Sequence, residues 1–224
     1  MRKNTKYCLI ILYILFRCTS SLNSQPSEFK WAKQAGGSGG DIGSGITVDE
    51  LGSSFIIGSF EDTATFGSTT MISAGHTDIF FAKYDTKGNI VWIKQIGNIG
   101  PDRGNSICMD KFGNCLVTGT FSGTVNFGTI KLTSVGGEDI FITKYDAMGN
   151  VVWAKQAGGG GDDIGYGIAT DGLGNAFITG LFHGDATFDK IILRSSSSQH
   201  DIFIAKYDKL GNMFWANQTQ GIWK

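Results

Sequence analysis

Apolar and polar residues follow a repeating pattern of short strands along most of the chain. The clearest copy covers residues 139–146 (DIFITKYD), followed by a Gly149-Asn150 turn and residues 151–156 (VVWAKQ), and it recurs at 78–95 and 201–218. Such apolar runs, bounded by turns, are too short for helices and predict buried strands. Glycine in the turn can take the positive φ that a tight hairpin needs. A second hairpin joins residues 46–49 to 55–58, with partners within 107–119 and 168–180.

The strand pattern has a fixed period. Trp31, Trp92, Trp153 and Trp215 lie 61, 61 and 62 residues apart, and the extra residue falls near a serine run before Asp201. The period predicts three repeats within residues 25–218, at about 31–91, 92–152 and 153–214, with a partial strand at each end and a divergent tail at 219–224. Each repeat predicts four antiparallel strands in one twisted sheet, with a further short pair near residues 65–72. No window outside the N-terminus has helical periodicity, so the predicted class is all-β.

The first 24 residues differ from the rest and predict a signal peptide. Arg2, Lys3 and Lys6 precede an apolar run at 8–16, and small residues follow it. This layout is typical of secretion signals, and the run is too short for a transmembrane anchor. Cys18 is an alternative site of lipidation, although Arg17 stands where a lipoprotein signal has a small residue. The expected location is therefore the periplasm, the cell surface or the medium. If Cys18 is lipidated, the expected location is the outer membrane, with the lipid as the anchor.

Charge and composition narrow the classes of function. Removal of residues 1–24 leaves 15 basic and 20 acidic residues, a net charge of −5. A mildly acidic chain without a basic cluster is a poor nucleic-acid binder. Glycine contributes 33 of 224 residues, about twice the usual share, and these glycines fall largely at repeated turns.

Two cysteines occur in the predicted mature chain, both in the middle repeat. Cys108 and Cys115 flank one predicted turn, and the other repeats have Thr, Ser or Ala at these positions. Two small side chains in a packed hairpin are one interpretation. A disulfide between them is the other, because export permits it.

Repeated charged residues suggest structural roles more readily than catalysis. Asp41, Asp102 and Asp163 share one repeat position, which is typical of turn caps that bind backbone amides. Calcium held by these carboxylates is the alternative, and no other metal or cofactor is expected. The repeated lysines Lys83, Lys144 and Lys206 are expected at solvent-facing strand ends. The three histidines fall at unlike repeat positions, and no catalytic residue is predicted.

The residues 145–153 (YDAMGNVVW), 167–171 (GIATD) and 175–180 (NAFITG) resemble the bacterial β-propeller repeats called SBBP repeats, found in exported and surface proteins. The resemblance covers about residues 29–218. It implies four-stranded blades arranged radially around an axis, and it implies little about activity.

Three repeats are fewer than the four to eight blades of a closed propeller, so a partial or open propeller is expected. A shortened relative of a longer protein is the favoured explanation, because an open array exposes strand edges. Association of copies into a ring is the alternative. The expected function is a non-enzymatic surface scaffold or a module that binds a protein or glycan. The alternatives are an exported propeller enzyme, hydrolytic or quinoprotein-like, and a remnant of a longer protein.

Overall fold

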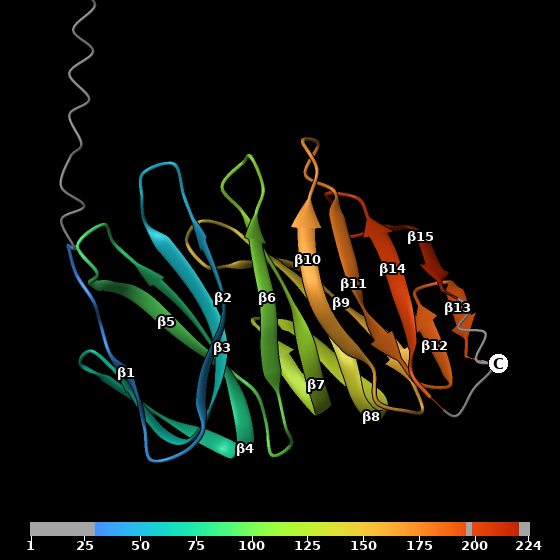
Figure 1. Cartoon of the computed structure of the whole chain (residues 1–224), viewed down its shortest axis with the longest axis horizontal. Coiled ribbons are helices and arrows are strands. Elements are labelled where there is room, and N and C mark those ends of the chain that lie inside the picture. Colours follow the sequence, from blue (N-terminus) through green and yellow to red (C-terminus); the bar gives the residue numbers. More distant parts are fainter. Residues whose placement is uncertain (1–29, 196–198, 220–224) are drawn as a thin grey trace, which may run out of the picture. The chain divides into compact units, whose positions relative to one another are not determined.

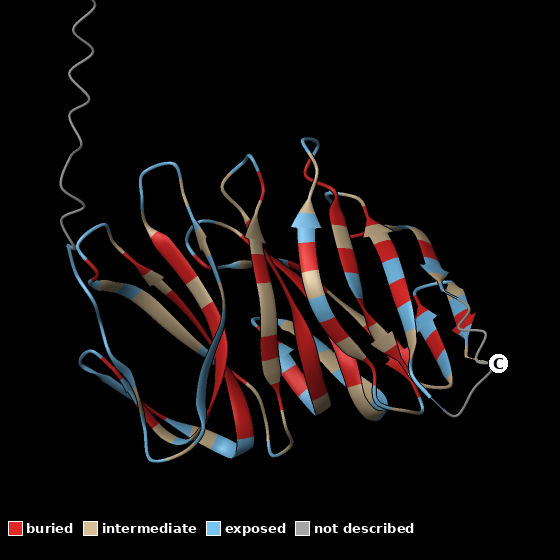
Figure 2. Cartoon of the chain, viewed as in Figure 1, coloured by how far each residue is buried: buried red, intermediate tan, exposed pale blue. Residues whose placement is uncertain are grey.

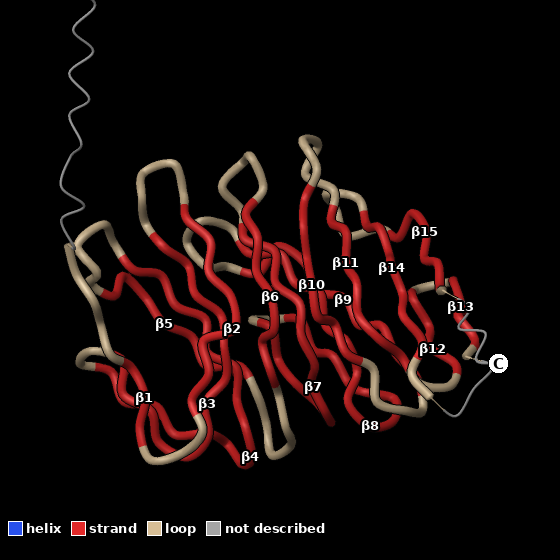
Figure 3. The backbone as a smooth tube through the Cα atoms, in the orientation of Figure 1, coloured by secondary structure: helices blue, strands red, loops and turns tan. Residues whose placement is uncertain are grey.

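The computed structural model of the protein describes residues 30–195 and 199–219. Every helix or strand assigned in this part of the chain is a β-strand (Figure 3). None of the described residues forms a helix of the length and apolar character needed to cross a membrane. The all-β prediction is therefore confirmed. The strands are β1 (Ala35–Gly37), β2 (Asp41–Val48), β3 (Ser54–Phe66), β4 (Thr69–Tyr84), β5 (Ile90–Ile96), β6 (Arg103–Met109), β7 (Cys115–Phe127), β8 (Ile130–Tyr145), β9 (Val151–Gly159), β10 (Ile164–Thr170), β11 (Ala176–Phe182), β12 (Asp185–Phe188), β13 (Ile191–Arg194), β14 (Asp201–Tyr207) and β15 (Met213–Gln218).

The strands from Trp31 onward form three antiparallel sheets, one for each repeat. Strands β2 to β5 with β1 make the first, β6 to β9 with β12 and β13 the second, and β10, β11, β14 and β15 the third. Neighbouring sheets contact each other through their first strands, β2 with β6 and β6 with β10 (Figure 1). The array is open, since the first and third sheets lie at opposite ends of it. The four main strands of each repeat run from residue 41 to 96, 103 to 159 and 164 to 218, so repeats counted from the tryptophans divide each of these sets within its last strand.

The central strands are buried on both faces. Ile79, Phe80, Phe81 and Ala82 of β4 are all buried, as expected of a strand between two layers (Figure 2). Phe80, Phe141 and Phe203, which share one repeat position, are buried too. One core cluster joins apolar residues of the first and second sheets, and another joins those of the second and third, so each sheet covers its neighbour.

Backbone pairing also joins consecutive repeats. The end of β9 pairs with β12 of the third repeat, in the register Ala157 opposite Phe188 and Gly159 opposite Ala186, so β12 and β13 extend the second sheet. At the start of the chain, β1 pairs with the far half of β3 in the same way, with Ala35 opposite Phe66. The short pair predicted near residues 65–72 is the far half of β3 and β4, and only the third repeat has it as separate strands. The end of β9 therefore fastens the third repeat to the second, and β1 binds the first repeat in the same way.

Three tryptophans of the period, Trp31, Trp92 and Trp153, each contact a turn of the following repeat. The indole Nε1 of Trp31 donates to the carbonyl of Thr86, and that of Trp153 to the carbonyl of Lys209, both at 3.1 Å. Trp92 lies against Gly149, where a Cβ atom would stand 3.0 Å from the indole ring. Because Gly149 also has a φ of 79°, glycine is required there both by the backbone and by the neighbouring ring.

Candidate binding rim

Six turns of one construction lie along one edge of the array, which we call the turn rim. They join the first two strands and the last two strands of each sheet, so antiparallel pairing places all six at the same edge, uppermost in Figure 1. In each turn one carboxylate oxygen of the leading aspartate accepts the backbone amides two and four residues later. At Asp110 these are Phe112 and Asn114, at 2.9 and 3.0 Å. The turns are residues 49–53, 85–89, 110–114, 146–150, 171–175 and 208–212.

Five of these turns expose a large apolar side chain at the same position, two residues after the aspartate. We call these side chains the apolar tips, and between 60% and 84% of each is exposed. Because the amide at this position is bound to the aspartate, the side chain is held outside the turn. The sixth turn has Lys87 there. Single exposed leucines are common on proteins, whereas a repeated row along one edge is typical of an interaction surface. The apolar tips are Leu51, Phe112, Met148, Leu173 and Leu210.

A hollow lies between the first two apolar tips on the inner strands. It has a volume of about 280 Å³ and is lined by Leu51, Met109 and Phe112 together with Asp49, Glu50 and Lys111 among others. An apolar floor with charges of both signs around it can accept an apolar side chain and bind the polar backbone beside it.

Lysines form ion pairs with the leading aspartates of three rim turns. Lys144 lies 2.8 Å from Asp110, and both side chains are almost completely buried. Burial alone would raise the pKa of Asp110, but Lys144 and the amides of the turn outweigh it and hold the pKa below its ordinary value. Lys83 and Lys206 pair with Asp49 and Asp171 at 3.5 Å. The prediction that these lysines point to solvent is wrong, because each is bound by the aspartate that caps a rim turn.

The three calcium candidates lie at the opposite edge of the array, and backbone amides occupy their carboxylates. Asp41 accepts the amide of Gly37 at 2.7 Å. Asp102 accepts the amides of Asn98 and Ser122, and Asp163 those of Gly159 and His183. The predicted role as caps of backbone amides is confirmed. Among the described residues no group of three or more acidic, histidine or cysteine side chains could hold a metal ion.

Burial changes the acidity of these caps. Loss of solvent raises the pKa of Asp102 to about 7 and that of Asp163 to about 6, against the lowering by the bound amides. A second buried carboxylate lies near each of these caps. The negative charge of Asp78 further raises the pKa of Asp102, and that of Asp139 further raises the pKa of Asp163. Asp139 accepts Gln156 at 2.6 Å through Oδ2, and its Oδ1 is buried without a hydrogen-bond partner.

The two cysteines of the middle repeat do not form a disulfide, which was one of the two interpretations of their spacing. The register places Cys108 opposite Leu116 and Cys115 opposite Met109, so the two side chains lie on opposite faces of the sheet. Cys115 belongs to the core between the first two sheets, and Cys108 packs against the core between the second and third. Both are free thiols, and burial raises the pKa of each to about 12. The alternative interpretation, small side chains in a packed hairpin, is correct.

Two of the three histidines come together although their repeat positions differ. The rings of His183 and His200 are 5.5 Å apart, beside a hollow that Asp162 and three glycines help to line. Cys18 and the predicted signal peptide lie outside the described residues.

Sequence reasoning missed the apolar tips. Their signal is present as Leu51, Phe112 and Leu173, which are 61 residues apart within otherwise polar turns. The pattern is not distinguishable from a buried hairpin residue until the hydrogen bonds of the turn fix the side chain outward.

Comparisons with known proteins agree with the observed sheets. Residues 30–59 and 152–181 each match the family model SBBP, described as a β-propeller repeat. An uncharacterized WD repeat-containing protein of Acanthamoeba polyphaga mimivirus is 30% identical over 176 residues, or 62% of this chain. The chain spans 12% of the length of that relative.

A protein of unknown function from Bacteroides caccae is similar over 80% of this chain and 82% of its own, at 9% identity and a TM-score of 0.30. The viral relative does not bear on the predicted bacterial origin, which stays a prediction, as does export.

Proposed function

We propose that the protein is a non-enzymatic, exported propeller-repeat module that binds a protein partner through the turn rim. The row of apolar tips carries this proposal. Five large side chains stand at one edge, on turns made rigid by two backbone amides that donate to each aspartate, and in three of the five turns also by a lysine paired with that aspartate. A rigid apolar row loses little conformational freedom when it is covered, which favours binding.

Two features favour a protein partner over a glycan. The tips are mainly aliphatic, and the hollow between Leu51 and Phe112 has the size and lining that suit an apolar side chain. Most other repeated polar side chains already bind residues of the chain itself, such as Lys144 with Asp110 and Gln156 with Asp139. Export is supported by the sequence of residues 1–24 alone.

The test is a selection of displayed random peptides on the purified protein, with the triple variant Leu51→Ser, Phe112→Ser, Leu173→Ser as the counter-selection. We expect peptides with aromatic and aliphatic residues that bind the wild type and lose at least about tenfold in affinity on the triple variant. The matched control is Val91→Ser with Val152→Ser, because both valines are exposed to a similar degree but lie on outer strands.

Two results would overturn the proposal. One is selected peptides that bind the triple variant as tightly as the wild type. The other is binding on a glycan array that survives in the triple variant, without any peptide that depends on the tips. A panel of glycosidase and dehydrogenase substrates, run on the wild type, tests the enzyme alternative directly.

A further inference from the structure

The two ends of the array expose apolar positions that are buried elsewhere in the chain. At the first repeat, Ile46 on β2 is 64% exposed, whereas Ile107 and Ile168 at the same repeat position are each 8% exposed. Val48 and Ile42 on the same strand are exposed as well. We call Ile42, Ile46 and Val48 the leading face. In Figure 2, β2 has no buried segment.

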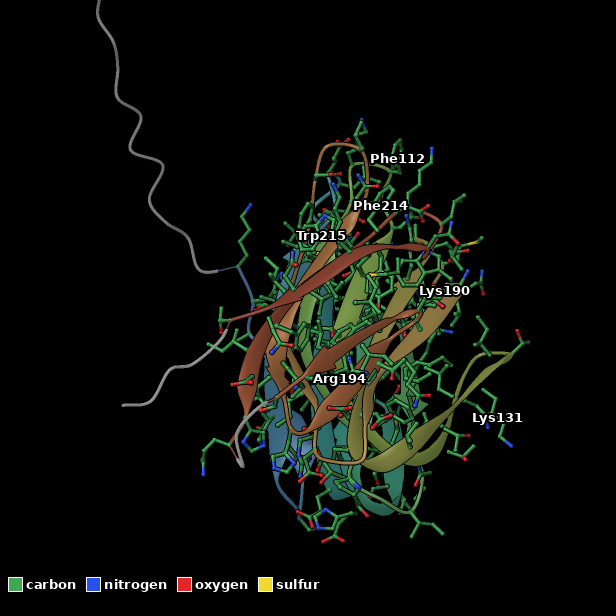
Figure 4. All side chains as sticks on the ribbon, turned by 90° about the vertical axis from the view of Figure 1, so that its right-hand side faces the viewer. Phe112, Lys131, Lys190, Arg194, Phe214 and Trp215 are labelled. Atoms are coloured by element: carbon green, nitrogen blue, oxygen red, sulfur yellow. The ribbon has the colours of Figure 1, made fainter. Side chains whose placement is uncertain are left out.

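The last repeat shows the opposite half of the same interface. Ile202 and Ile204 on β14 are 57% and 45% exposed, while their counterparts in the first two repeats are completely buried. Phe177 on β11 is half-buried, and its counterpart Leu116 is buried. We call Phe177, Ile202 and Ile204 the trailing face. Figure 4 looks onto this end of the array and shows Phe214 and Trp215 on the neighbouring outer strand β15.

Inside the chain these two kinds of face cover each other. Ile107 of the second repeat packs in one cluster with Phe55, Ile79 and Phe81 of the first. Ile168 of the third repeat packs in the same way with Leu116, Ile140 and Ile142 of the second. The chain therefore contains two examples of the contact between a leading face and a trailing face, and it leaves one of each face uncovered.

We propose that a second copy of this chain covers these faces head to tail, with the trailing face of one copy on the leading face of the other. The occupant follows from the internal contacts, because the counterparts of Ile46 on the open leading face already pack against the counterparts of Ile202 and Ile204 on the open trailing face. Such a contact uses two different surfaces, so two copies joined at both ends form a ring of six repeats, within the range of closed propellers.

The outer strand at the new junction is supplied by one copy only. Trp31 and β1 already occupy the place that the last strand of a preceding repeat takes, through the hydrogen bond to Thr86 and the pairing with β3. A docked copy would bring its own β15 to the same place. Because Trp31 and β1 are bound there within the chain, β15 of the docked copy does not take this place.

The test is sedimentation velocity of the full chain over a range of concentrations. We expect a dimer for the wild type and a rise of at least about 100-fold in the dimer Kd for Ile46→Asp and for Ile204→Asp, because each places an unpaired charge in an apolar contact. Both side chains are well exposed in the single chain, so the variants fold, which far-UV circular dichroism checks. Val91→Asp, on the outer strand β5, is the matched control and dimerises like the wild type.

Mixing the two variants distinguishes head-to-tail association from other dimers. Ile46→Asp keeps an intact trailing face and Ile204→Asp an intact leading face, so a mixture forms a heterodimer although neither variant associates alone. Trp215→Ala, which loosens β15, leaves the dimer in place. A wild type that stays monomeric, a dimer that tolerates both aspartates, or loss of the dimer in Trp215→Ala would overturn the arrangement. The variant without apolar tips dimerises normally, so failure of the rim proposal is measured separately.

Discussion

Replacement of Trp153 by alanine should cost about 3–5 kcal/mol of unfolding free energy, the range for large aromatic residues in a core. Trp153 is 6% exposed and belongs to the core between the second and third sheets. Its Nε1 also donates to Lys209 of the third repeat at 3.1 Å. Trp31 makes the equivalent hydrogen bond but is 37% exposed, so Trp31→Ala should cost only about 1–2 kcal/mol.

Equilibrium unfolding in urea, followed by far-UV circular dichroism, measures both costs without dependence on tryptophan fluorescence. Trp153→Phe separates the two contributions, since it keeps most of the packing and should lose about 1 kcal/mol with the hydrogen bond. Met148→Ser, at an exposed tip, should change stability by no more than about 0.5 kcal/mol. If Trp153→Ala cost no more than Trp31→Ala, burial of the indole would not be what holds consecutive repeats together.

Three further results are expected from the buried polar groups. Stability should fall by on the order of 2–4 kcal/mol as pH rises from about 4 to about 7, because the raised pKa values of Asp102 and Asp163 make the folded chain bind protons that the unfolded chain has released. Urea midpoints at pH 5 and pH 8 measure this change. An unchanged pH dependence in the double variant D102N/D163N would contradict it. Lys144→Met should cost about 3–5 kcal/mol in the same unfolding assay because it leaves the Asp110 carboxylate buried without its partner, and a cost as small as that of the more exposed pair at Lys206, about 1 kcal/mol, would refute a buried ion pair. The two thiols of the middle repeat should resist alkylation in the folded protein at pH 8 and react fully in urea without a reductant, as peptide mapping would show; a disulfide-linked peptide would contradict the register of β6 and β7.

The repeats, their strands and their turns could be predicted because each is written several times in the sequence. The Gly-Asn turns and the apolar run at 78–84 appear in three copies, and the structure confirms the strands and the turn caps in all three. What could not be predicted depends on register. Whether Cys108 and Cys115 share a face changes with a shift of one residue, because successive side chains alternate between faces.

The solvent exposure of a side chain in one particular repeat could not be predicted from the sequence either. Lys144 was expected at the surface because lysine at a strand end usually reaches solvent, but Asp110 lies close enough to bind it inside. Ile46 and Ile107 occupy the same repeat position, and only their place in the array makes one exposed and the other buried. A periodic sequence specifies the contact but not which copies lack a neighbour.

The run of β9 into the third repeat has a consequence for how such chains lengthen. A tandem copy of a 61-residue stretch that contains β9 and the hairpin of β12 and β13 supplies both the strand that reaches into the next repeat and the hairpin that receives it. A newly duplicated segment can therefore pair with its neighbouring repeats as soon as it arises. Removal of the four main strands of one repeat at their borders would instead separate that strand from the hairpin with which it pairs. The 61-residue unit that a duplication can add is therefore shifted along the chain from the unit that forms one set of main strands.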